Sequence, residues 1–212
     1  MHLAIEGVIG VGKTTLARLL QPLFSAELLL EVFEENPFLS DFYAERARYA
    51  FQTQIFFLLS RYHQQRQAVP EALGRGSLIS DYTFAKDALF ARLTLSGDEL
   101  SMYQRVHEAL AEKIPGPDLL VYLRAETDVL MQRIVTRDRP YERNMERAYI
   151  DQLNVAYEGF VRAHTAAPVL IVDTNAVNFT TDPAQVEHIA ERIRAALGIG
   201  TYQVSLPLED LK

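Results

Sequence analysis

The chain has 212 residues, of which 49% are hydrophobic and 23% charged, so it can fill the core of one domain and is neither disordered nor low in complexity. It has no cysteine, which excludes disulfides, thiolate metal sites and thiol nucleophiles. Its formal net charge of −7 argues against a nucleic-acid partner, and its apolar runs are far shorter than the ~20 residues of a membrane span, which argues against a membrane partner.

Strand-like and helix-like segments alternate along the chain. The predicted strands are residues 3–6, 28–32, 77–80, 118–123 and 169–172. The predicted helices are residues 14–24, 41–67, 84–93, 100–114, 127–136, 145–165 and 183–197, with Pro70, Gly74 and Gly76 ending the second. This order predicts an α/β fold with a five-stranded parallel sheet and helices on both faces. We expect a single domain over residues 1–200 and a C-terminal tail over residues 201–212. No secretory leader precedes the first strand, so we expect a cytoplasmic protein.

Residues 7–14 fit the phosphate-binding pattern G-x-x-x-x-G-K-[ST] at every defined position, between a predicted strand and a predicted helix. Lys13 should reach the β- and γ-phosphates of a nucleoside triphosphate, and Thr14 should bind Mg²⁺. The predicted binding residues are Gly7, Val8, Ile9, Gly10, Val11, Gly12, Lys13, Thr14 and Thr15. The guanine-reading Asn-Lys-x-Asp of GTPases is absent, so a kinase of a small molecule is the simplest interpretation.

Two carboxylates follow predicted strands at the edge where the phosphate motif begins. Glu31 stands at the end of the second strand and Asp81 at the end of the third. Ligands of open α/β sheets bind beyond the carboxyl ends of the strands, so both should meet the phosphate motif. We assign Glu31 to orienting and deprotonating the attacking hydroxyl and Asp81 to holding Mg²⁺. Glu34 and Glu35 are nearby rivals for the first role.

An arginine-rich segment follows the fourth strand. Arg133 and Arg137 are four residues apart on a predicted helix, and Arg139 lies just past its end. A phosphoryl group in transfer requires positive charge around it, so we expect three converging guanidinium groups on a lid. The alternative is a solvated basic helix end, which the helix dipole would favour.

Taken in order, these motifs resemble those of the deoxynucleoside kinase family, specifically its branch of bacterial deoxyguanosine and deoxyadenosine kinases. The similar segments span nearly the whole chain and are residues 5–15, 31–39, 42–43, 54–61, 81–87 and 137–142. The resemblance implies a P-loop kinase fold with an arginine-rich lid, in which ATP is the phosphate donor.

The resemblance also implies roles for single residues. Glu31 corresponds to the base that takes the proton of the sugar 5′-hydroxyl, Tyr43 and Glu142 to the pair that binds the 3′-hydroxyl, and Gln54 to the glutamine that reads the base. Among the further matches, Arg61 tunes base preference and Asp87 is a second carboxylate that reads the base. Phe57 and the Phe84 region sandwich the base. The resemblance also implies that Arg133, Arg137 and Arg139 are the lid arginines and that the loop at Asp173 packs on the donor adenine. The alternatives are a half-buried helix face for Tyr43 and Gln54, and a plain loop for Asp173.

The sequence departs from the family pattern at one place. Many members carry Asp/Glu-Arg-Ser after the third strand, and there the arginine holds the catalytic glutamate and the 5′-oxygen. Here Asp81 is followed by Tyr82 and Thr83. Lys86, one helical turn on and one of four lysines, is our candidate substitute. The Asp-Tyr form is similar to the deoxyguanosine-type bacterial members, so guanine is the leading base.

These expectations converge on ATP-dependent 5′-phosphorylation of a purine deoxyribonucleoside in nucleotide salvage, deoxyguanosine before deoxyadenosine. The alternatives are a thymidylate kinase-like monophosphate kinase, against which Tyr82 argues, and a nucleotide-binding regulatory subunit. The long helices over residues 41–67 and 143–165 carry surplus apolar surface, so we expect a homodimer or a heterodimer with a sister subunit.

Overall fold

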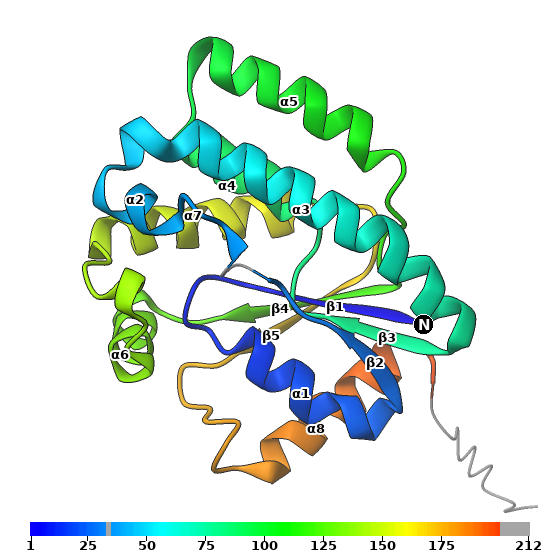
Figure 1. Cartoon of the computed structure of the whole chain (residues 1–212). Coiled ribbons are helices and arrows are strands. Elements are labelled where there is room, and N and C mark those ends of the chain that lie inside the picture. The colour runs from blue at the N-terminus through cyan, green and yellow to red at the C-terminus, as the bar shows by residue number, and fades with distance from the viewer. Residues whose placement is uncertain (33–34, 200–212) are drawn as a thin grey trace, which may run out of the picture.

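The computed structural model describes residues 1–32 and 35–199 and has an α/β architecture (Figure 1). The predicted tail over residues 201–212 and Glu34 lie outside the described residues. The five strands are β1 (His2–Glu6), β2 (Ala26–Leu29), β3 (Ser77–Ser80), β4 (Leu119–Arg124) and β5 (Val169–Asp173). They form one sheet in the order β2-β3-β1-β4-β5 with every neighbouring pair parallel, which confirms the predicted sheet.

Helices cover both faces of this sheet, as predicted. They are α1 (Lys13–Phe24), α2 (Leu39–Ala44), α3 (Arg46–Arg75), α4 (Lys86–Thr94), α5 (Gly97–Ala111), α6 (Thr127–Arg137), α7 (Arg147–Ala163) and α8 (Pro183–Ala196), with a 3₁₀ turn, η2, at Pro140–Glu142. Helices α1 and α8 lie on one face, α3, α4 and α7 lie on the other, and α5 packs on α3 and α4 farther from the sheet (Figure 1). No helix of the described part of the chain combines the length and hydropathy of a membrane span.

Most elements begin or end a few residues from their predicted bounds, and three differences change the local structure. β2 ends at Leu29, because its partner strand β3 ends at Ser80, the residue opposite Leu29, and offers no further pairing. Glu31 therefore lies in the loop beyond the strand, and not at its end. The predicted helix over residues 41–67 is two helices, α2 and α3, which Glu45 separates with a non-helical φ of −139° and ψ of 70°.

The third difference concerns Pro70, which lies inside α3 and does not end it. Proline removes one backbone hydrogen bond of a helix, but Pro70 is exposed, so water can reach the carbonyl that loses its donor. Val69 and Ala72 on the opposite side are buried in a cluster with Leu78, which holds the helix against the sheet. The helix ends at Arg75, directly before Gly76.

Candidate active site

The phosphate-binding motif turns sharply between β1 and α1 at glycines that no other residue could replace without strain. Gly7 has a φ of 148° and Gly12 a φ of 104°, which side chains disfavour. A Cβ on Gly7 would lie 2.4 Å from the carbonyl oxygen of Leu123. Backbone N–H groups in such a turn, at the positive end of a helix, form an anion site, so residues 7–14 have the geometry that a bound phosphate requires.

Lys13 bends back over this loop. Its Nζ donates hydrogen bonds to the carbonyl oxygens of Gly7 at 2.6 Å and Val8 at 3.3 Å. Burial, with the charge of Lys86 as the second cause, lowers the pKa of Lys13 to about 8. Burial of the ammonium group is thus the main cause, and the carboxylates of Glu6, Glu31 and Asp81 act against it.

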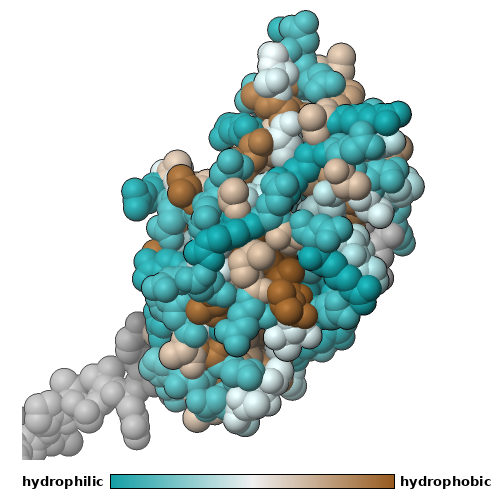
Figure 2. All heavy atoms as spheres, turned by 90° about the vertical axis from the view of Figure 1, so that its left-hand side faces the viewer, coloured by the Kyte–Doolittle hydropathy of each residue, from teal (hydrophilic) through white to brown (hydrophobic). Residues whose placement is uncertain are grey.

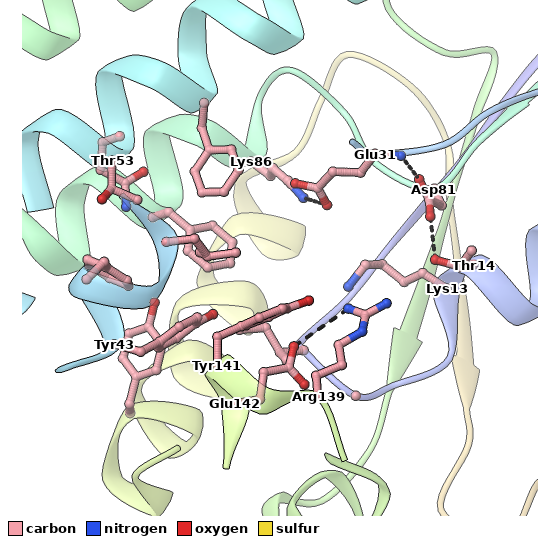
Figure 3. A pocket seen from close by; sticks show the side chains of 18 of the residues that line it. Lys13, Thr14, Glu31, Tyr43, Thr53, Asp81, Lys86, Arg139, Tyr141 and Glu142 are labelled. Atoms are coloured by element: carbon pink, nitrogen blue, oxygen red, sulfur yellow. Dashed lines mark hydrogen bonds and ion pairs between the residues drawn. The ribbon is translucent and has the colours of Figure 1, made fainter. Parts of the chain in front are cut away.

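Asp81 connects the phosphate loop to the segment that carries Glu31. Its Oδ2 accepts a hydrogen bond of 2.5 Å from the hydroxyl of Thr14, and its Oδ1 accepts one of 2.8 Å from the backbone N–H of Glu31 (Figure 3). The backbone N–H of Asp81 in turn donates to the carbonyl of Leu29 at 3.2 Å. One carboxylate thus fixes the position of Glu31, which lies outside any helix or strand.

Two cations bind the side chain of Glu31. Nζ of Lys86 donates to Oε2 at 2.6 Å, and Nε of Arg61 donates to Oε1 at 3.1 Å, with a second contact from the Arg61 Nη2 atom. Burial raises the pKa of the Glu31 carboxyl, but the charges and hydrogen bonds of Lys86 and Arg61 outweigh it and hold this pKa well below its usual range. Glu31 is therefore ionised at neutral pH.

Arg61 also binds Asp87, which is fully buried. Nη1 of Arg61 contacts Oδ1 of Asp87, while Oδ2 has no hydrogen-bond partner among the described residues. Burial raises the pKa of Asp87 to about 6, against the opposing charges of Arg61 and Lys86. Asp87, which the resemblance implies reads the base, does not line the cavity, whereas its partner Arg61 does.

A cavity of about 120 Å³ brings most of the predicted residues together. Its lining includes Ile9, Gly10, Lys13, Thr14, Glu31, Tyr43, Gln54, Phe57, Arg61, Asp81, Lys86, Arg137, Arg139 and Glu142. Thr53 lies at the end farthest from Lys13 and Thr14, and Glu31 with Lys86 lies across the cavity from Tyr141 and Glu142 (Figure 3). The cavity therefore runs from the phosphate loop, past Glu31, to the N-terminal part of α3.

Glu142 organises the wall opposite Glu31. It is buried in η2, and its Oε2 accepts a hydrogen bond of 2.5 Å from Arg137, while Arg139 lies 3.7 Å from Oε1. Tyr43 of α2 stacks on Tyr141 of η2 with ring centroids 6.2 Å apart. The predicted pair for a sugar hydroxyl and two of the predicted lid arginines thus meet on one wall.

Arg133 departs from the predicted convergence. Its guanidinium donates to the carbonyl oxygens of Thr174 at 2.5 Å and Val177 at 2.9 Å and to the Thr174 hydroxyl at 3.1 Å. It lines a second cavity of about 660 Å³, whose lining also includes Gly12, Thr15, Arg137, Asn175 and Phe179. Arg133 therefore lines only the second cavity, together with Arg137, and not the first, because the loop after β5 supplies carbonyl acceptors to its guanidinium group.

Asp173, for which the resemblance implies a place in the loop on the donor adenine, is the last residue of β5. Its exposed carboxylate pairs with Arg124 at 3.3 Å and accepts a hydrogen bond of 3.0 Å from the backbone N–H of Asn175. Asp173 does not line the second cavity, whereas Asn175 and Phe179 do. It therefore shapes the loop that carries these two residues.

Phe90 and Glu6 are two residues of the site region that were not predicted from the sequence. Phe90 lines the first cavity, while Phe84 stacks on His107 at a centroid distance of 4.9 Å and does not line it. Glu6, fully buried at the end of β1, accepts hydrogen bonds from the backbone N–H of Thr83 at 2.6 Å and from the hydroxyl of Tyr157 at 3.0 Å. An acidic residue in an apolar strand is the signal that could have identified Glu6.

Comparisons with known proteins agree with this geometry. The sequence model of the family described as "Deoxynucleoside kinase" matches residues 3–197. Deoxyguanosine kinase of Bacillus subtilis is 35% identical over 197 residues, which cover 91% of this chain and 95% of that protein. Deoxyadenosine/deoxycytidine kinase of the same organism is 28% identical, with 92% of each chain covered.

Solved structures give the same result for the fold. Deoxyadenosine kinase from M. mycoides with bound dATP superposes with a TM-score of 0.80 at 26% sequence identity, covering 92% of this chain and all of that chain. The same enzyme with bound dCTP gives a TM-score of 0.79 at 25% identity. The chain therefore belongs to the deoxynucleoside kinase family and is a phosphotransferase built on the P-loop kinase fold.

Proposed function

We propose that this protein transfers the γ-phosphoryl group of ATP to the 5′-hydroxyl of a purine deoxyribonucleoside in nucleotide salvage, with deoxyguanosine preferred over deoxyadenosine. The observation that carries the proposal is the position of Glu31. Its carboxylate lies in one cavity with Lys13 and Thr14 of the phosphate loop and with Tyr43 and Gln54. A nucleoside whose base lies near Gln54 would present its 5′-hydroxyl between Glu31 and the terminal phosphate.

Glu31 is the group that receives the proton of the attacking hydroxyl. The 5′-oxygen forms a bond to the γ-phosphorus, the bond between that phosphorus and the bridging oxygen of ADP breaks, and the proton passes to Glu31. A carboxylate with a low pKa is a weak base, but phosphoryl transfer passes through a loose transition state in which the proton leaves late. Orientation of the hydroxyl therefore matters more than basicity, and the contacts from Lys86 and Arg61 fix that orientation.

The donor side fits ATP with Mg²⁺. The phosphate loop supplies backbone N–H groups for the phosphates, and Lys13 supplies positive charge. Mg²⁺ binds hard oxygen ligands and usually keeps phosphate and water ligands beside one or two from the protein, a set that the adjacent Thr14 hydroxyl and Asp81 carboxylate fit. When bound, the ion neutralises charge on the donor phosphates. The described residues hold no cluster of three or more His, Cys, Asp or Glu side chains that could bind a metal.

The sugar and the base meet the remaining walls. Tyr43 and Glu142 would bind the 3′-hydroxyl, while Arg137 and Arg139, which adjoin Glu142, bring positive charge to the transferred group. Arg133, one turn from Arg137 on α6, would act on the donor through the second cavity. A nucleoside without the 3′-hydroxyl should bind much more weakly, because the buried polar groups that bind this hydroxyl would be left unpaired.

Arg61, which lines the cavity between Glu31 and Asp87, supports guanine as the base. Arg61 has five N–H donors, and its contacts with Glu31 and Asp87 use three of them. Guanine presents two acceptors, O6 and N7, to such a donor, whereas adenine presents a donor amine beside N7. Gln54 supplies one donor and one acceptor for the opposite edge, and Phe57 and Phe90 would stack on the ring.

The test is a phosphorylation assay with ATP and Mg²⁺ against deoxyguanosine, deoxyadenosine, deoxycytidine and thymidylate. Monophosphate formation from deoxyguanosine at the highest kcat/KM supports the proposal, and a strong loss in Gln54→Ala ties the base to this cavity. Phosphorylation of thymidylate alone would overturn the proposal in favour of a monophosphate kinase.

We further propose a cytoplasmic homodimer. Leu59 of α3 and Val155 of α7 are 42% and 74% exposed, which supports a partner for these helices. On the face shown in Figure 2, by contrast, apolar atoms occur in small groups among hydrophilic ones. Light scattering of the purified chain tests the assembly: a mass of two chains supports it, and a monomer that pairs only with a second kinase chain points to the heterodimer.

A further inference from the structure

Lys86 is a buried cation in an electrostatically unfavourable place. It is the first residue of α4, where the helix dipole disfavours positive charge, and only 5% of its side chain is exposed. It also lies close enough to Lys13 for its charge to lower the pKa of that residue. Burying an ammonium group is costly unless something compensates its charge. A lysine at this position therefore needs an explanation beyond packing.

The contacts of Lys86 compensate the positive charge of its buried ammonium group only in part. Its single ion pair among the described residues is the 2.6 Å contact with Oε2 of Glu31. The rings of Tyr82 and Phe90 lie 5.6 and 5.9 Å from Nζ and supply weaker cation–π attraction. An ammonium group has three N–H donors, and the contact with Glu31 uses one. Lys86 also lines the cavity.

Arg61, the other cation on Glu31, is bound differently. It pairs with two carboxylates, Glu31 and Asp87, so its charge is compensated on both sides. Lys86 shares the charge of Glu31 with Arg61 and forms no ion pair with a second acid among residues 1–32 and 35–199, although the charge of the nearby Asp87 also acts on it. A new negative charge beside Glu31 would therefore meet an ammonium group that has N–H donors left to bind it.

Tyr82, the residue at which the sequence departs from the family pattern, cannot supply a cation to the cavity. It is fully buried, and its hydroxyl donates to Oε1 of Gln64 at 2.5 Å. Lys86 lies one turn further on and borders the same space as Glu31. The cation that binds Glu31 from this side of the cavity is thus a lysine on α4.

We propose that Lys86 binds the phosphoryl group as it reaches the 5′-oxygen, with Glu31 orienting its ammonium group toward that oxygen. This inference rests on the proposed function, because it assumes that a 5′-hydroxyl lies beside Glu31. When the proton of the hydroxyl reaches Glu31, the carboxylate loses its charge while the transferred group brings negative charge to the same place. Lys86 neither gains nor loses a proton in this step. The anion that its ammonium group binds changes from the carboxylate of Glu31 to the new phosphate ester.

The affinity for the monophosphate product distinguishes a lysine that binds the transferred phosphate from a lysine that only holds Glu31 in place. A deoxynucleoside and its 5′-monophosphate differ only in the phosphate group, so a cation that faces this group affects the affinity of the second ligand alone. The variants are Lys86→Met, Lys86→Gln, which keeps a donor for Glu31 without the charge, and Lys86→Arg, which keeps the charge. Lys113→Met, at an exposed lysine after α5, is the matched control.

Calorimetry with deoxyguanosine and with deoxyguanosine 5′-monophosphate, without ATP, is the decisive measurement. In Lys86→Met and Lys86→Gln we expect the affinity for the monophosphate to fall about tenfold or more and that for the nucleoside to change by less than about threefold. Turnover should fall about 10²-fold or more with little change in the nucleoside KM, and Lys86→Arg should recover part of it. Lys113→Met should match the unaltered protein.

Equal weakening of both ligands, or turnover in Lys86→Gln within about threefold of the unaltered protein, would overturn the inference. The binding measurement needs no catalysis. If the unaltered protein binds the monophosphate but phosphorylates no nucleoside, the proposed function fails, and the role of Lys86 toward a 5′-phosphate is still decided. Thermal unfolding of each variant shows whether it is folded, and Lys86→Gln decides the question if Lys86→Met is not.

Discussion

The hydroxyl of Thr14 donates a hydrogen bond of 2.5 Å to Oδ2 of Asp81, and this contact joins the phosphate loop to the end of β3. The other oxygen of Asp81 binds the backbone N–H of Glu31 at 2.8 Å. The donor side and the acceptor side of the cavity therefore share one carboxylate. A change at Asp81 should disturb both, which few other residues could do.

Asp81→Asn tests this shared role. An amide can accept only at its oxygen, so if that oxygen keeps the N–H of Glu31, the amide nitrogen faces Thr14 and the Thr14 hydroxyl can no longer donate to it. The negative charge that suits Mg²⁺ is lost as well. We expect turnover to fall about 10²-fold and the concentration of Mg²⁺ needed for half-maximal rate to rise. Steady-state kinetics against Mg²⁺ measure both, with Asp151→Asn, at an exposed position on α7, as the control. An unchanged dependence on Mg²⁺ would remove Asp81 from the proposed metal site.

Glu31→Gln tests the proposed base. Glutamine has nearly the same shape but cannot take the proton, so we expect kcat to fall about 10²- to 10⁴-fold with nucleoside affinity changed by less than about threefold. Glu112→Gln, at an exposed position after α5, is the control. Because Lys86 and Arg61 hold the pKa of Glu31 well below its usual range, the group stays ionised when the pH falls from about 7 to about 5. An acid limb that Glu31→Gln abolishes in that range would contradict this assignment.

The strands and the sheet were predictable because parallel strands buried on both faces form continuous apolar runs. Residues 119–123, for example, are all fully buried. Their ends were less predictable, since β2 stops at Leu29 only because β3 stops at Ser80. Such a limit depends on a strand that is distant in the sequence and leaves no local signal.

The meeting of the phosphate loop, Glu31 and Asp81 was predictable from the rule for strand ends, whereas side-chain directions were not. Arg133 binds carbonyl groups of residues 174–177, which sequence spacing cannot place beside it. The helix predicted over residues 84–93 begins two residues later, at Lys86. Phe90, one turn after Lys86, shares its face and lines the cavity, whereas Phe84, which the resemblance implied for the base, precedes the helix and does not line the cavity.

Gly7→Ala tests the tight turn of the phosphate loop. The new Cβ would lie 2.4 Å from the backbone oxygen of Leu123 at a φ of 148°, so the loop or β4 must shift. We expect the free energy of unfolding to fall by about 2 kcal/mol or more and ATP binding to weaken strongly. Gly74→Ala is the control, because nothing lies within 4 Å of its Cβ and alanine stabilises a helix by about 0.5–1 kcal/mol. Denaturant unfolding and calorimetry with ATP measure the two effects, and a Gly7→Ala protein as stable as its parent would contradict the clash.

His2→Gln tests a pH-dependent contribution to stability far from the cavity. His2 is buried in β1 with Nε2 3.0 Å from the hydroxyl of Ser80, and burial lowers its pKa from 6.5 to about 4. Between these values the unfolded chain binds the proton and the folded chain does not, so stability is lost as the pH falls from 6.5 toward 4. The full shift corresponds to about 3 kcal/mol. In the His2→Gln protein this loss should be absent, whereas replacement of the exposed His188 by glutamine should leave it intact. Denaturant unfolding at about pH 7, 5.5 and 4 gives the difference directly, and parallel losses in the parent and the His2→Gln protein would show that His2 is not the titrating group.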